Sequence, residues 1–378
     1  MKRYVLVPDS FKGTLTSMEI CEILREEILS AKPEAEVISI PVADGGEGSV
    51  DAFLTAMGGE RIEVVCHGPY MEKMTAFYGL LPDGTAVVEM AAAAGLPLVG
   101  KWKAPDQTTT YGVGELMADA IKRGARQIIL GLGGSATNDG GCGAAAALGV
   151  RFIDTNGKIF LPTGGTLDRI AHIDIGNQLP LPKVIVMCDI DNPLFGPTGA
   201  SAVFGPQKGA DPDMVTKLDQ NLHHLAEMIR QDLAFEVETL PGAGAAGGMG
   251  AGAVAFWGGH LQMGIETVLD MVKFDDILQD AQLVITGEGR LDGQSVHGKV
   301  VSGVAKRAKR AGIPVVAVVG SIGDGADSIY ELGICSVFST NHSPEPFETA
   351  CLHSHENLRR TAKNLMGLLT AVETVFQS

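Results

Sequence analysis

The sequence predicts an α/β fold in which a doubly wound domain with a mostly parallel sheet is built from both ends of the chain. A second, mixed α/β domain is inserted between these ends. Two observations lead to this prediction. Apolar runs and helical stripes alternate near the N-terminus and again in the last third of the chain, whereas the middle holds short apolar runs joined by a hairpin turn.

The N-terminal region reads as two strand–helix steps. A capping box, Thr16 with Glu19 three residues later, predicts the start of the first helix, and Ile20, Leu24 and Ile28 continue it with helical spacing. The expected elements are strands at 4–7 and 36–41, and helices after Thr16 and at 50–57. This βαβα opening is typical of parallel strands.

The remaining elements follow in the same way. Pro82-Asp83-Gly84 is the expected hairpin turn of the middle region. Strands are expected at 61–65, 74–81, 86–89, 127–132, 184–187, 282–286, 314–319 and 333–338, and helices at 140–148, 301–308 and 355–376. We place the borders at residues 61 and 274, so the first domain comprises 1–60 with 275–378, and the inserted domain comprises 61–274.

Composition and charge exclude several classes of function. The 378 residues include 29 Lys and Arg and 45 Asp and Glu, a formal net charge of −16 that argues against nucleic acid or a membrane surface as partner. With 45% hydrophobic and 5% aromatic residues, we expect a folded chain with an aliphatic core. The six cysteines have no CxxC spacing, and neither a signal peptide nor a membrane helix is evident, so a cytoplasmic protein is expected.

Functional groups gather in three loops that we expect at one edge of the sheet. Ligands of open parallel sheets bind at the carboxyl ends of the strands. Any one of these loops reads equally well as a turn whose Asp or Ser caps the next helix, but three on one edge favour a ligand site. The groups are Asp9, Ser10 and Lys12 after the first strand, Asp44, Glu47 and Ser49 after the second, and Glu288, Arg290 and Asp292 after the strand at 282–286.

A glycine-rich turn, GLGGSATNDGG (131–141), follows the apolar run 128–130 and opens a helix of small residues at 143–148. Glycines let successive backbone N–H groups point inward, and a helix N-terminus adds partial positive charge, so the turn suits an anion. Ser135, Thr137 and Asn138 add side-chain donors. The alternative is a purely structural strand-to-helix turn.

Two further segments are less specific. Asp189 directly follows the strand at 184–187, where a carboxylate can ligate a metal, accept a proton or cap the turn before Pro193. The run at 293–299 matches the GxxxxGK part of a Walker A loop, but Val300 stands where a Ser or Thr is needed and the preceding strand ends too early. Lys299 therefore remains a candidate phosphate contact without a P-loop.

A set of segments, in order along the whole chain, resembles the bacterial glycerate kinase family (type 1) of glyoxylate and glucarate catabolism. The segments are PDSFKGT (8–14), ADGGEGS (43–49), GLGGSATNDGG (131–141), CDIDNPLFGPTGA (188–200), FGPQKGA (204–210), GAGAAGGMGAG (242–252) and TGEGRLDGQSVHGK (286–299). The resemblance implies a Rossmann-like domain, a second α/β domain and an active site in the cleft between them. It is compatible with a homodimer.

The resemblance also implies a transferase that uses ATP and Mg²⁺ to phosphorylate D-glycerate. The expected products are 2-phospho-D-glycerate and ADP. Formation of 3-phosphoglycerate, or another small hydroxy acid as substrate, is the alternative.

Residue roles are assigned on this basis as hypotheses. Some of Asp44, Glu47 and Asp189 would hold Mg²⁺, and Asp189 is preferred as the acceptor of the hydroxyl proton. The catalytic set is Lys12, Asp44, Asp189 and Arg290; the substrate- or phosphate-binding set is Asp9, Ser10, Gly133, Gly134, Ser135, Thr137, Asn138, Asp139, Glu288, Asp292 and Lys299. The cations would balance the phosphate or the glycerate carboxylate.

Two other classes of function remain as alternatives. A dinucleotide-dependent oxidoreductase would carry GxGxxG after its first strand, where this chain has PDSFKGT. A non-catalytic carboxylate sensor would not need so many carboxylates beside glycine-rich loops. The run GAGAAGGMGAG is expected to begin a tightly packed helix beside the site, in a structural role.

Overall fold

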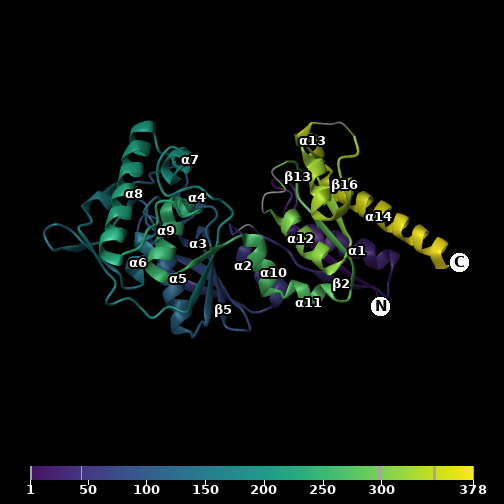
Figure 1. The fold of residues 1–378 in the computed structure, drawn as a ribbon, viewed down its shortest axis with the longest axis horizontal. Helices are drawn as coiled ribbons and strands as arrows, with labels where there is room; N and C mark the ends of the chain where they lie inside the picture. The colour runs from purple at the N-terminus through teal and green to yellow at the C-terminus, as the bar shows by residue number, and fades with distance from the viewer. Residues whose placement is uncertain (1, 44, 294, 296–298, 344–345, 378) are drawn as a thin grey trace. The chain divides into compact units, whose positions relative to one another are not determined.

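The chain divides into two compact units. Unit 1 comprises Met1–Ala43 and Ile265–Ser378, so it contains both ends of the chain, and unit 2 comprises Asp44–Gly264 (Figure 1). The structure is a computed structural model that describes residues 2–43, 45–293, 295, 299–343 and 346–377.

Unit 1 is built on a five-stranded sheet in which every pairing is parallel. The strand order is β16-β14-β12-β1-β2, with β1 at Arg3–Pro8, β2 at Glu36–Ser39, β12 at Ala281–Gly287, β14 at Val315–Val319 and β16 at Ile334–Ser339. β1 lies between β2 and β12, and Val5 is paired with Val284. Strands from the two ends of the chain are therefore direct neighbours.

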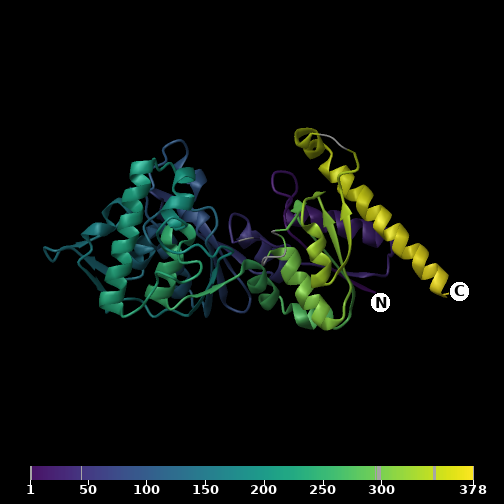
Figure 2. The same ribbon diagram turned by 45° about the horizontal axis from the view of Figure 1, so that its top comes forward.

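Helices cover both faces of this sheet. α1 (Ser17–Ala31) and α14 (Ser354–Gln377) pack on one face with Tyr4 and Leu6 of β1, while α12 (Val300–Ala311) packs against β1, β12 and β14. Figure 2 shows the sheet between these two helical layers. The remaining elements of the unit are α10 (Gly264–Met271), α11 (Phe274–Leu278), α13 (Phe347–Leu352), the 3₁₀ helix η3 (Ala326–Leu332), and the short strands β13 (Arg290–Leu291) and β15 (Ser321–Ile322).

The predicted capping box is confirmed at the start of α1. Thr16 Oγ1 accepts from the backbone N–H of Glu19 (3.2 Å), and Glu19 Oε2 accepts from the backbone N–H of Thr16 (2.7 Å). Two backbone donors that the first helical turn leaves unpaired are thereby satisfied, so this short sequence pattern defines the helix start.

Unit 2 contains a six-stranded mixed sheet of order β11-β10-β6-β5-β4-β3. Its strands are β3 (Glu60–His67), β4 (Lys73–Leu80), β5 (Thr85–Glu89), β6 (Gln127–Gly131), β10 (Lys183–Met187) and β11 (His260–Gln262). Strands β5, β6, β10 and β11 are parallel, whereas β3, β4 and β5 are joined antiparallel. The predicted turn between β4 and β5 is confirmed: Gly84 has φ +86° and donates to Leu81 O (3.0 Å).

Short helices and one long helix surround this sheet. The helices are α2 (Ser49–Met57), α3 (Ala91–Ala94), α4 (Leu96–Val99), α5 (Tyr111–Lys122), α6 (Cys142–Ala147), α7 (Ala200–Phe204), α8 (Pro212–Leu233) and α9 (Ala245–Trp257), with 3₁₀ helices η1 (Gly164–Arg169) and η2 (Pro206–Lys208). A small sheet adds β7 (Arg151–Ile153), β8 (Ile159–Phe160) and β9 (His172–Asp174). The core is aliphatic, as expected, with Tyr78 and Phe152 among the few large aromatic side chains enclosed.

The units meet at residues 43/44 and 264/265, whereas the expected borders were 61 and 274. α2 accounts for the first difference, because Val50 and Leu54 pack against Gly79 of β4 in unit 2. α10 accounts for the second, because Ile265 packs against Gly303 of α12 in unit 1. In both places a helix packs with the unit that follows it in the chain, which an apolar pattern alone does not show.

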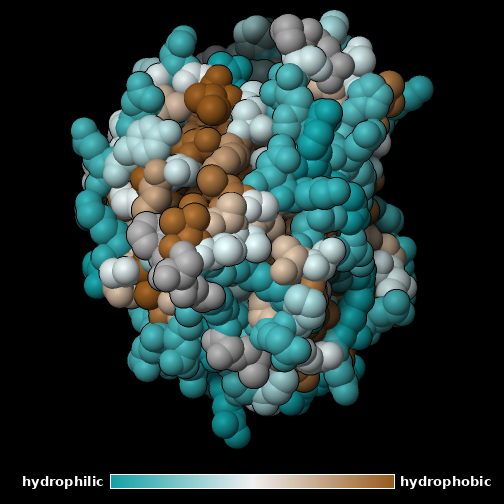
Figure 3. Space-filling model, turned by 90° about the vertical axis from the view of Figure 1, so that its right-hand side faces the viewer, coloured by the Kyte–Doolittle hydropathy of each residue, from teal (hydrophilic) through white to brown (hydrophobic). Residues whose placement is uncertain are grey.

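The helix α14 carries both buried and exposed apolar side chains. Leu358 and Leu365 are buried against the unit, whereas Leu368 and Val372 are 54% and 44% exposed. Figure 3 shows one face of the molecule, on which hydrophobic residues gather in a band among hydrophilic ones. The apolar face of α14 therefore extends beyond the residues that pack on α1.

All six cysteines are free thiols, and burial raises the pKa of Cys21 to about 12 and that of Cys66 to about 11. These two thiols are therefore poor nucleophiles at neutral pH, because the thiolate is the reactive form. Among the described helices, none is long and apolar enough to cross a membrane.

Candidate functional site

In unit 1, the loops that follow β1 and β12 lie side by side at the carboxyl edge of the sheet. Pro8 is paired with Gly287, and the backbone N–H of Asp9 donates to Gly287 O (2.8 Å). A Cβ added at Gly289 would lie 3.2 Å from the Cα of Phe11, so the two backbones approach closely. The structure therefore brings together the residues predicted for these two loops.

Glu288 is the most unusual carboxyl group of this edge. It is 5% exposed, and its Oε1 atom has no hydrogen-bond partner among the described residues. Burial raises the pKa of Glu288 to about 7, with Asp9 and Asp292 acting in the same direction and Ser295 and Lys299 opposing it. A carboxyl group that titrates near neutral pH suits proton transfer.

The cationic candidates of unit 1 are exposed. Arg290 has 68% of its side chain exposed, with Nε 3.5 Å from Asp292 Oδ2. Lys12 is also exposed, and Lys299 stands immediately before α12. The backbone N–H of Ser10 donates to Asp9 Oδ1 (2.7 Å), so these two residues form a local turn. In the Walker-like run, Gln294, Val296, His297 and Gly298 lie outside the described residues.

In unit 2, two of the predicted glycine-rich loops touch each other. The backbone N–H of Gly133 donates to Gly45 O (2.9 Å), and a Cβ added at Gly133 would lie 2.5 Å from the Cα of Gly46. A Cβ at Gly131 would lie 2.4 Å from Gly45 O. Glycine is required at both positions because the two backbones pack without space for a side chain. Asp44, at the start of the first loop, lies outside the described residues.

The carboxylates of Glu47 and Asp189 are exposed near the ends of β6 and β10. A Cβ added at Gly45 would lie 3.2 Å from the Cβ of Met187, so the loop that carries Glu47 also adjoins the end of β10, two residues before Asp189. Asp189 Oδ1 accepts from the backbone N–H of Gly264 (2.7 Å). Exposed carboxylates on one sheet edge fit Mg²⁺, which binds one or two protein carboxylates together with phosphate oxygens and water.

The described residues contain no group of three or more His, Cys, Asp or Glu side chains arranged to hold a metal ion by themselves. A cage made entirely by the protein is typical of other ions rather than Mg²⁺ at a nucleotide. The expected set of Asp44, Glu47 and Asp189 stays a prediction, since Asp44 is outside the described part of the chain.

The inner half of the glycine-rich turn is fully enclosed. Asp139 is 0% exposed, and its carboxylate accepts from the N–H and the hydroxyl of Thr110 (both 2.8 Å) and from the N–H groups of Gly141 and Gly143 (both 3.1 Å). Burial raises the pKa of Asp139, and these hydrogen bonds oppose that effect. Asp139 therefore holds the turn from the inside, and its expected role in phosphate binding stays a prediction.

Thr137 and Asn138 are also 0% exposed, but Thr137 Oγ1 and Asn138 Oδ1 have no hydrogen-bond partner in the part of the chain that the structure describes. Asn138 Nδ2 donates to Ser201 Oγ (3.1 Å). Ser135 is 6% exposed, Gly133 is half-buried and Gly134 is exposed. The first half of the turn is thus the part that a ligand can reach.

The glycine run at 242–252 explains how this turn is held. Within α9, Ala246, Gly247 and Gly248 have left-handed φ values of +53°, +69° and +89°, which kink the helix start. A Cβ at Gly247 would lie 2.1 Å from Thr137 O, and Gly247 O accepts from the backbone N–H of Gly140 (3.0 Å). The run is therefore packed directly on the turn, in the structural role expected for it.

Two buried ionisable residues at this edge were not singled out from the sequence. Lys208 is 2% exposed, and its Nζ donates to Ser135 Oγ (2.8 Å) and to Thr137 O (2.7 Å); burial lowers the pKa of this lysine to about 7. Glu89, at the end of β5, is 2% exposed and accepts from the N–H of Val50 (2.6 Å), and burial raises its pKa to about 7. Glu89 ends an apolar strand, and this position could have marked it as a candidate site residue. Lys208 lies in the sequence Gly-Pro-Gln-Lys-Gly, which is typical of an exposed turn.

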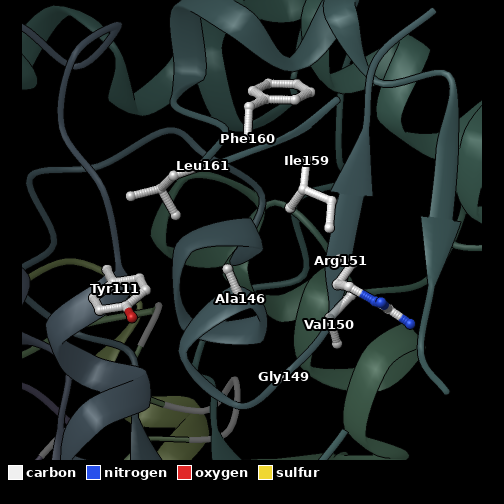
Figure 4. Close-up of a pocket in the computed structure, with 8 residues that line it drawn as sticks. All are labelled: Tyr111, Ala146, Gly149, Val150, Arg151, Ile159, Phe160 and Leu161. Carbon is white, nitrogen blue, oxygen red and sulfur yellow. The ribbon is translucent and has the colours of Figure 1, made fainter. Parts of the chain in front are cut away.

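A pocket of about 320 Å³ lies elsewhere in unit 2. Figure 4 shows Tyr111, Ile159 and Leu161 around Ala146 of α6, with the side chain of Arg151 directed away. None of the predicted site residues that the structure describes lines it. This pocket is therefore separate from the glycine-rich turn and its neighbours.

The fold and these loops define a mixed α/β protein with mostly parallel sheets and a glycine-rich, anion-compatible turn. The model of the glycerate kinase family matches residues 4–370. The chain belongs to the glycerate kinase family.

Relatives with known sequences or structures are similar to this chain over nearly its whole length. The chain is 48% identical to a glycerate kinase of Bacillus cereus (97% of each chain covered) and 44% identical to glycerate 2-kinase of Escherichia coli K12 (97% of this chain and 98% of that one). It is also similar to a crystal structure from Salmonella typhimurium LT2 provisionally assigned as glycerate kinase 2, with a TM-score of 0.88, 43% identity and 99% of each chain covered.

Proposed function

We propose that this protein is an ATP-dependent kinase that phosphorylates D-glycerate at its 2-hydroxyl, giving 2-phospho-D-glycerate and ADP. The observation that carries the proposal is the full-length similarity to relatives named glycerate kinase, one of which is named glycerate 2-kinase. The enzyme is thus a phosphotransferase with an alcohol group as acceptor. Formation of 3-phosphoglycerate, or a related hydroxy acid as substrate, is the alternative.

Phosphoryl transfer asks a protein mainly to position the reactants and to neutralise charge. In unit 2, the accessible half of the glycine-rich turn would bind phosphate oxygens through the backbone N–H groups of Gly134 and Ser135 and through the Ser135 hydroxyl. The contact between Gly133 and Gly45 supports this role, because it fixes the backbone of the turn before any ligand binds.

Mg²⁺ would be held by the exposed carboxylates Glu47 and Asp189 of unit 2, together with Asp44. When bound, the ion supplies positive charge for the phosphate oxygens. The protein carries a net charge of −16, so local positive charge is needed if two anions are to bind.

In unit 1, Lys12, Arg290 and Lys299 would supply further positive charge for the glycerate carboxylate or the transferred phosphate. Their exposure supports this role, because the charge of each cation is accessible to a ligand. Asp9, Ser10 and Asp292 belong to the same edge and would orient these groups.

During transfer, the hydroxyl oxygen of glycerate forms a bond to the γ-phosphorus, the bond from phosphorus to the bridging oxygen of ADP breaks, and the hydroxyl proton goes to a carboxylate. Asp189 is the preferred acceptor because it is exposed at the end of β10. Glu288 is the second candidate, supported by its unpartnered Oε1 and its pKa of about 7. The two are distinguished by mutation, as described in the Discussion.

Two coarser proposals accompany this one. The two compact units would be the two domains, one Rossmann-like and made from both chain ends, the other inserted. The protein would act in the cytoplasm, which the six free cysteines support, since a reducing compartment keeps thiols unpaired.

The test is an assay of ADP release with D-glycerate, ATP and Mg²⁺, with the position of the phosphate read by ³¹P NMR. Turnover that gives 2-phosphoglycerate is the expected result. Turnover that gives 3-phosphoglycerate would overturn the regiochemistry alone. No turnover by folded protein with D-glycerate, but turnover with another hydroxy acid, would overturn the substrate.

A further inference from the structure

Lys208 lies behind the glycine-rich turn with neutral groups as its hydrogen-bond partners. Its Nζ donates to the hydroxyl oxygen of Ser135 (2.8 Å) and to the carbonyl oxygen of Thr137 (2.7 Å), and the residue is 2% exposed. The charge of Asp139 also acts on it, but that carboxylate is already engaged by Thr110 and by two backbone N–H groups of the turn.

A buried ammonium is costly unless an anion compensates its charge. Here the two neutral partners accept hydrogen bonds from the ammonium but do not compensate its charge. An anion that binds at the accessible half of the turn would supply the compensating negative charge. The Ser135 hydroxyl would lie between this anion and Lys208 Nζ. A bound anion at the turn would therefore lower the free-energy cost of burying the Lys208 ammonium.

The hydrogen-bond direction at Ser135 leads to the same conclusion. An ammonium has three donors and no acceptor, so Ser135 Oγ must accept from Lys208. Its own O–H is then available to donate to a ligand, and the contact with a cation makes it a stronger donor. Thr137 Oγ1, for which the described residues provide no hydrogen-bond partner, is enclosed in the same turn.

We propose that Lys208 is a positioning residue of a phosphate site at residues 133–137, where it orients the Ser135 hydroxyl toward the anion and compensates the anion's charge. The inference rests on the proposed function in one respect: the anion is taken to be the polyphosphate of ATP. Lys208 acts through Ser135 and does not itself touch the substrate.

The proposal also predicts that Lys208 takes up a proton when the anion binds. Burial lowers the pKa of Lys208 to about 7, and a bound anion stabilises the charged form. At pH 8 the free protein therefore holds Lys208 mostly neutral, and binding of the anion returns a proton to it. Among the described residues, the groups that face Lys208 are Asp139, Ser135 and Thr137; Asp139 is the charged one, and its carboxylate already accepts hydrogen bonds from Thr110.

The test is isothermal titration of the full-length protein with MgATP at pH 8, in two buffers of different ionisation enthalpy. We expect the wild type to take up part of a proton per MgATP bound, and Lys208→Met to take up none and to bind MgATP about tenfold more weakly or worse. Lys208→Arg should restore part of the affinity but not the proton uptake. Lys103→Met is the matched control, because Lys103 is exposed and donates to the neighbouring Gln207 O (3.1 Å); it should behave as the wild type.

Unchanged MgATP affinity and proton uptake in Lys208→Met would overturn the proposal, as would a selective loss of D-glycerate binding. If Lys208→Met does not fold, the wild type alone decides: no proton uptake on MgATP binding at pH 8 contradicts the proposal. Its failure is distinguishable from failure of the proposed function, which would appear as no ADP release with D-glycerate in the wild type.

Discussion

The carboxylate of Asp139 accepts two hydrogen bonds of 2.8 Å from Thr110, one from its backbone N–H and one from its hydroxyl. Thr110 immediately precedes α5, and its hydroxyl also accepts from the backbone N–H of Ala144 in α6 (2.9 Å). One buried carboxylate therefore ties the glycine-rich turn to two helices. These contacts indicate that Asp139 stabilises the fold, although it lies in the motif that we predicted to bind phosphate.

We expect Asp139→Asn to lower the free energy of unfolding by about 2–4 kcal/mol, because an amide NH₂ would replace an oxygen that now faces donors. Chemical denaturation at pH 7 measures this. Asp191→Asn is the matched control, since Asp191 is exposed in the loop after β10, and should change stability by less than about 0.5 kcal/mol. A stable Asp139→Asn variant with weakened ATP binding would instead place Asp139 in the ligand site.

Asp189 is expected to act in the reaction rather than in folding. Asp189→Asn should lower kcat by about 10²–10⁴-fold while the melting temperature stays close to that of the wild type, since removal of a proton acceptor costs about this much. Steady-state kinetics with D-glycerate and MgATP measure the effect. If Asp189→Asn keeps its kcat and Glu288→Gln loses it, the proton acceptor is Glu288.

Glu288 should also make stability depend on pH. Burial raises its pKa from 4.5 to about 7 in the folded protein, so between these values the folded state binds more protons than the unfolded state. The contribution of Glu288 to stability is therefore present below about pH 4.5 and is lost as the pH rises to about 7.

Glu288→Gln removes this titration. The free energy of unfolding of the wild type, relative to that of Glu288→Gln, should fall by about 2 kcal/mol between pH 5 and pH 7.5. Glu89 titrates in the same range in both proteins, so it cancels in the difference. Parallel pH profiles for the two proteins would show that the Glu288 carboxyl is not perturbed.

Local signals in the sequence predicted the regular part of the fold well. The capping box of Thr16 and the strand signals at both chain ends are short-range features, and the structure has them. The sequence interpretation missed α8, although Asp211 caps its first turn and Pro212 stands at its first position, with Leu218, Leu222 and Leu225 buried at helical spacing. That signal was present and could have been used.

The inner parts of the site could not be predicted in the same way. Whether Asp139 faces a ligand or a helix, and whether Lys208 is exposed or enclosed, depends on segments that approach from elsewhere in the chain: Thr110 in the first case and Ser135 in the second. Motifs select the residue types, whereas burial and hydrogen-bond partners are long-range properties.

Arg307 of α12 holds α10 and α11 in place in unit 1. Its side chain is 8% exposed and pairs with Glu266, with Asp270 (2.5 Å) and with Asp275 (3.4 Å). Arg307→Ala would leave three partly exposed carboxylates near one another, so we expect it to lower the free energy of unfolding by about 1–3 kcal/mol. Arg123→Ala, which breaks an exposed pair with Asp119, should cost less than about 1 kcal/mol. Equal losses in denaturation experiments would contradict a special role for the buried arginine.

Gly247 permits the close approach of α9 to the glycine-rich turn. Its φ is +69°, and a Cβ there would lie 2.1 Å from Thr137 O, so Gly247→Ala must both strain its own backbone and displace the turn. Gly258→Ala is the control, because Gly258 has a similar φ of +60° with nothing within 4 Å of an added Cβ.

Both variants should lose about 1 kcal/mol from backbone strain, and Gly247→Ala should lose a further 1–3 kcal/mol from the clash, together with MgATP affinity. Thermal unfolding and MgATP titration measure the two effects. Because the strain is common to both variants, the difference between them isolates the contact with Thr137. If the two variants bind MgATP equally well, the packing of α9 on the turn does not control the phosphate site.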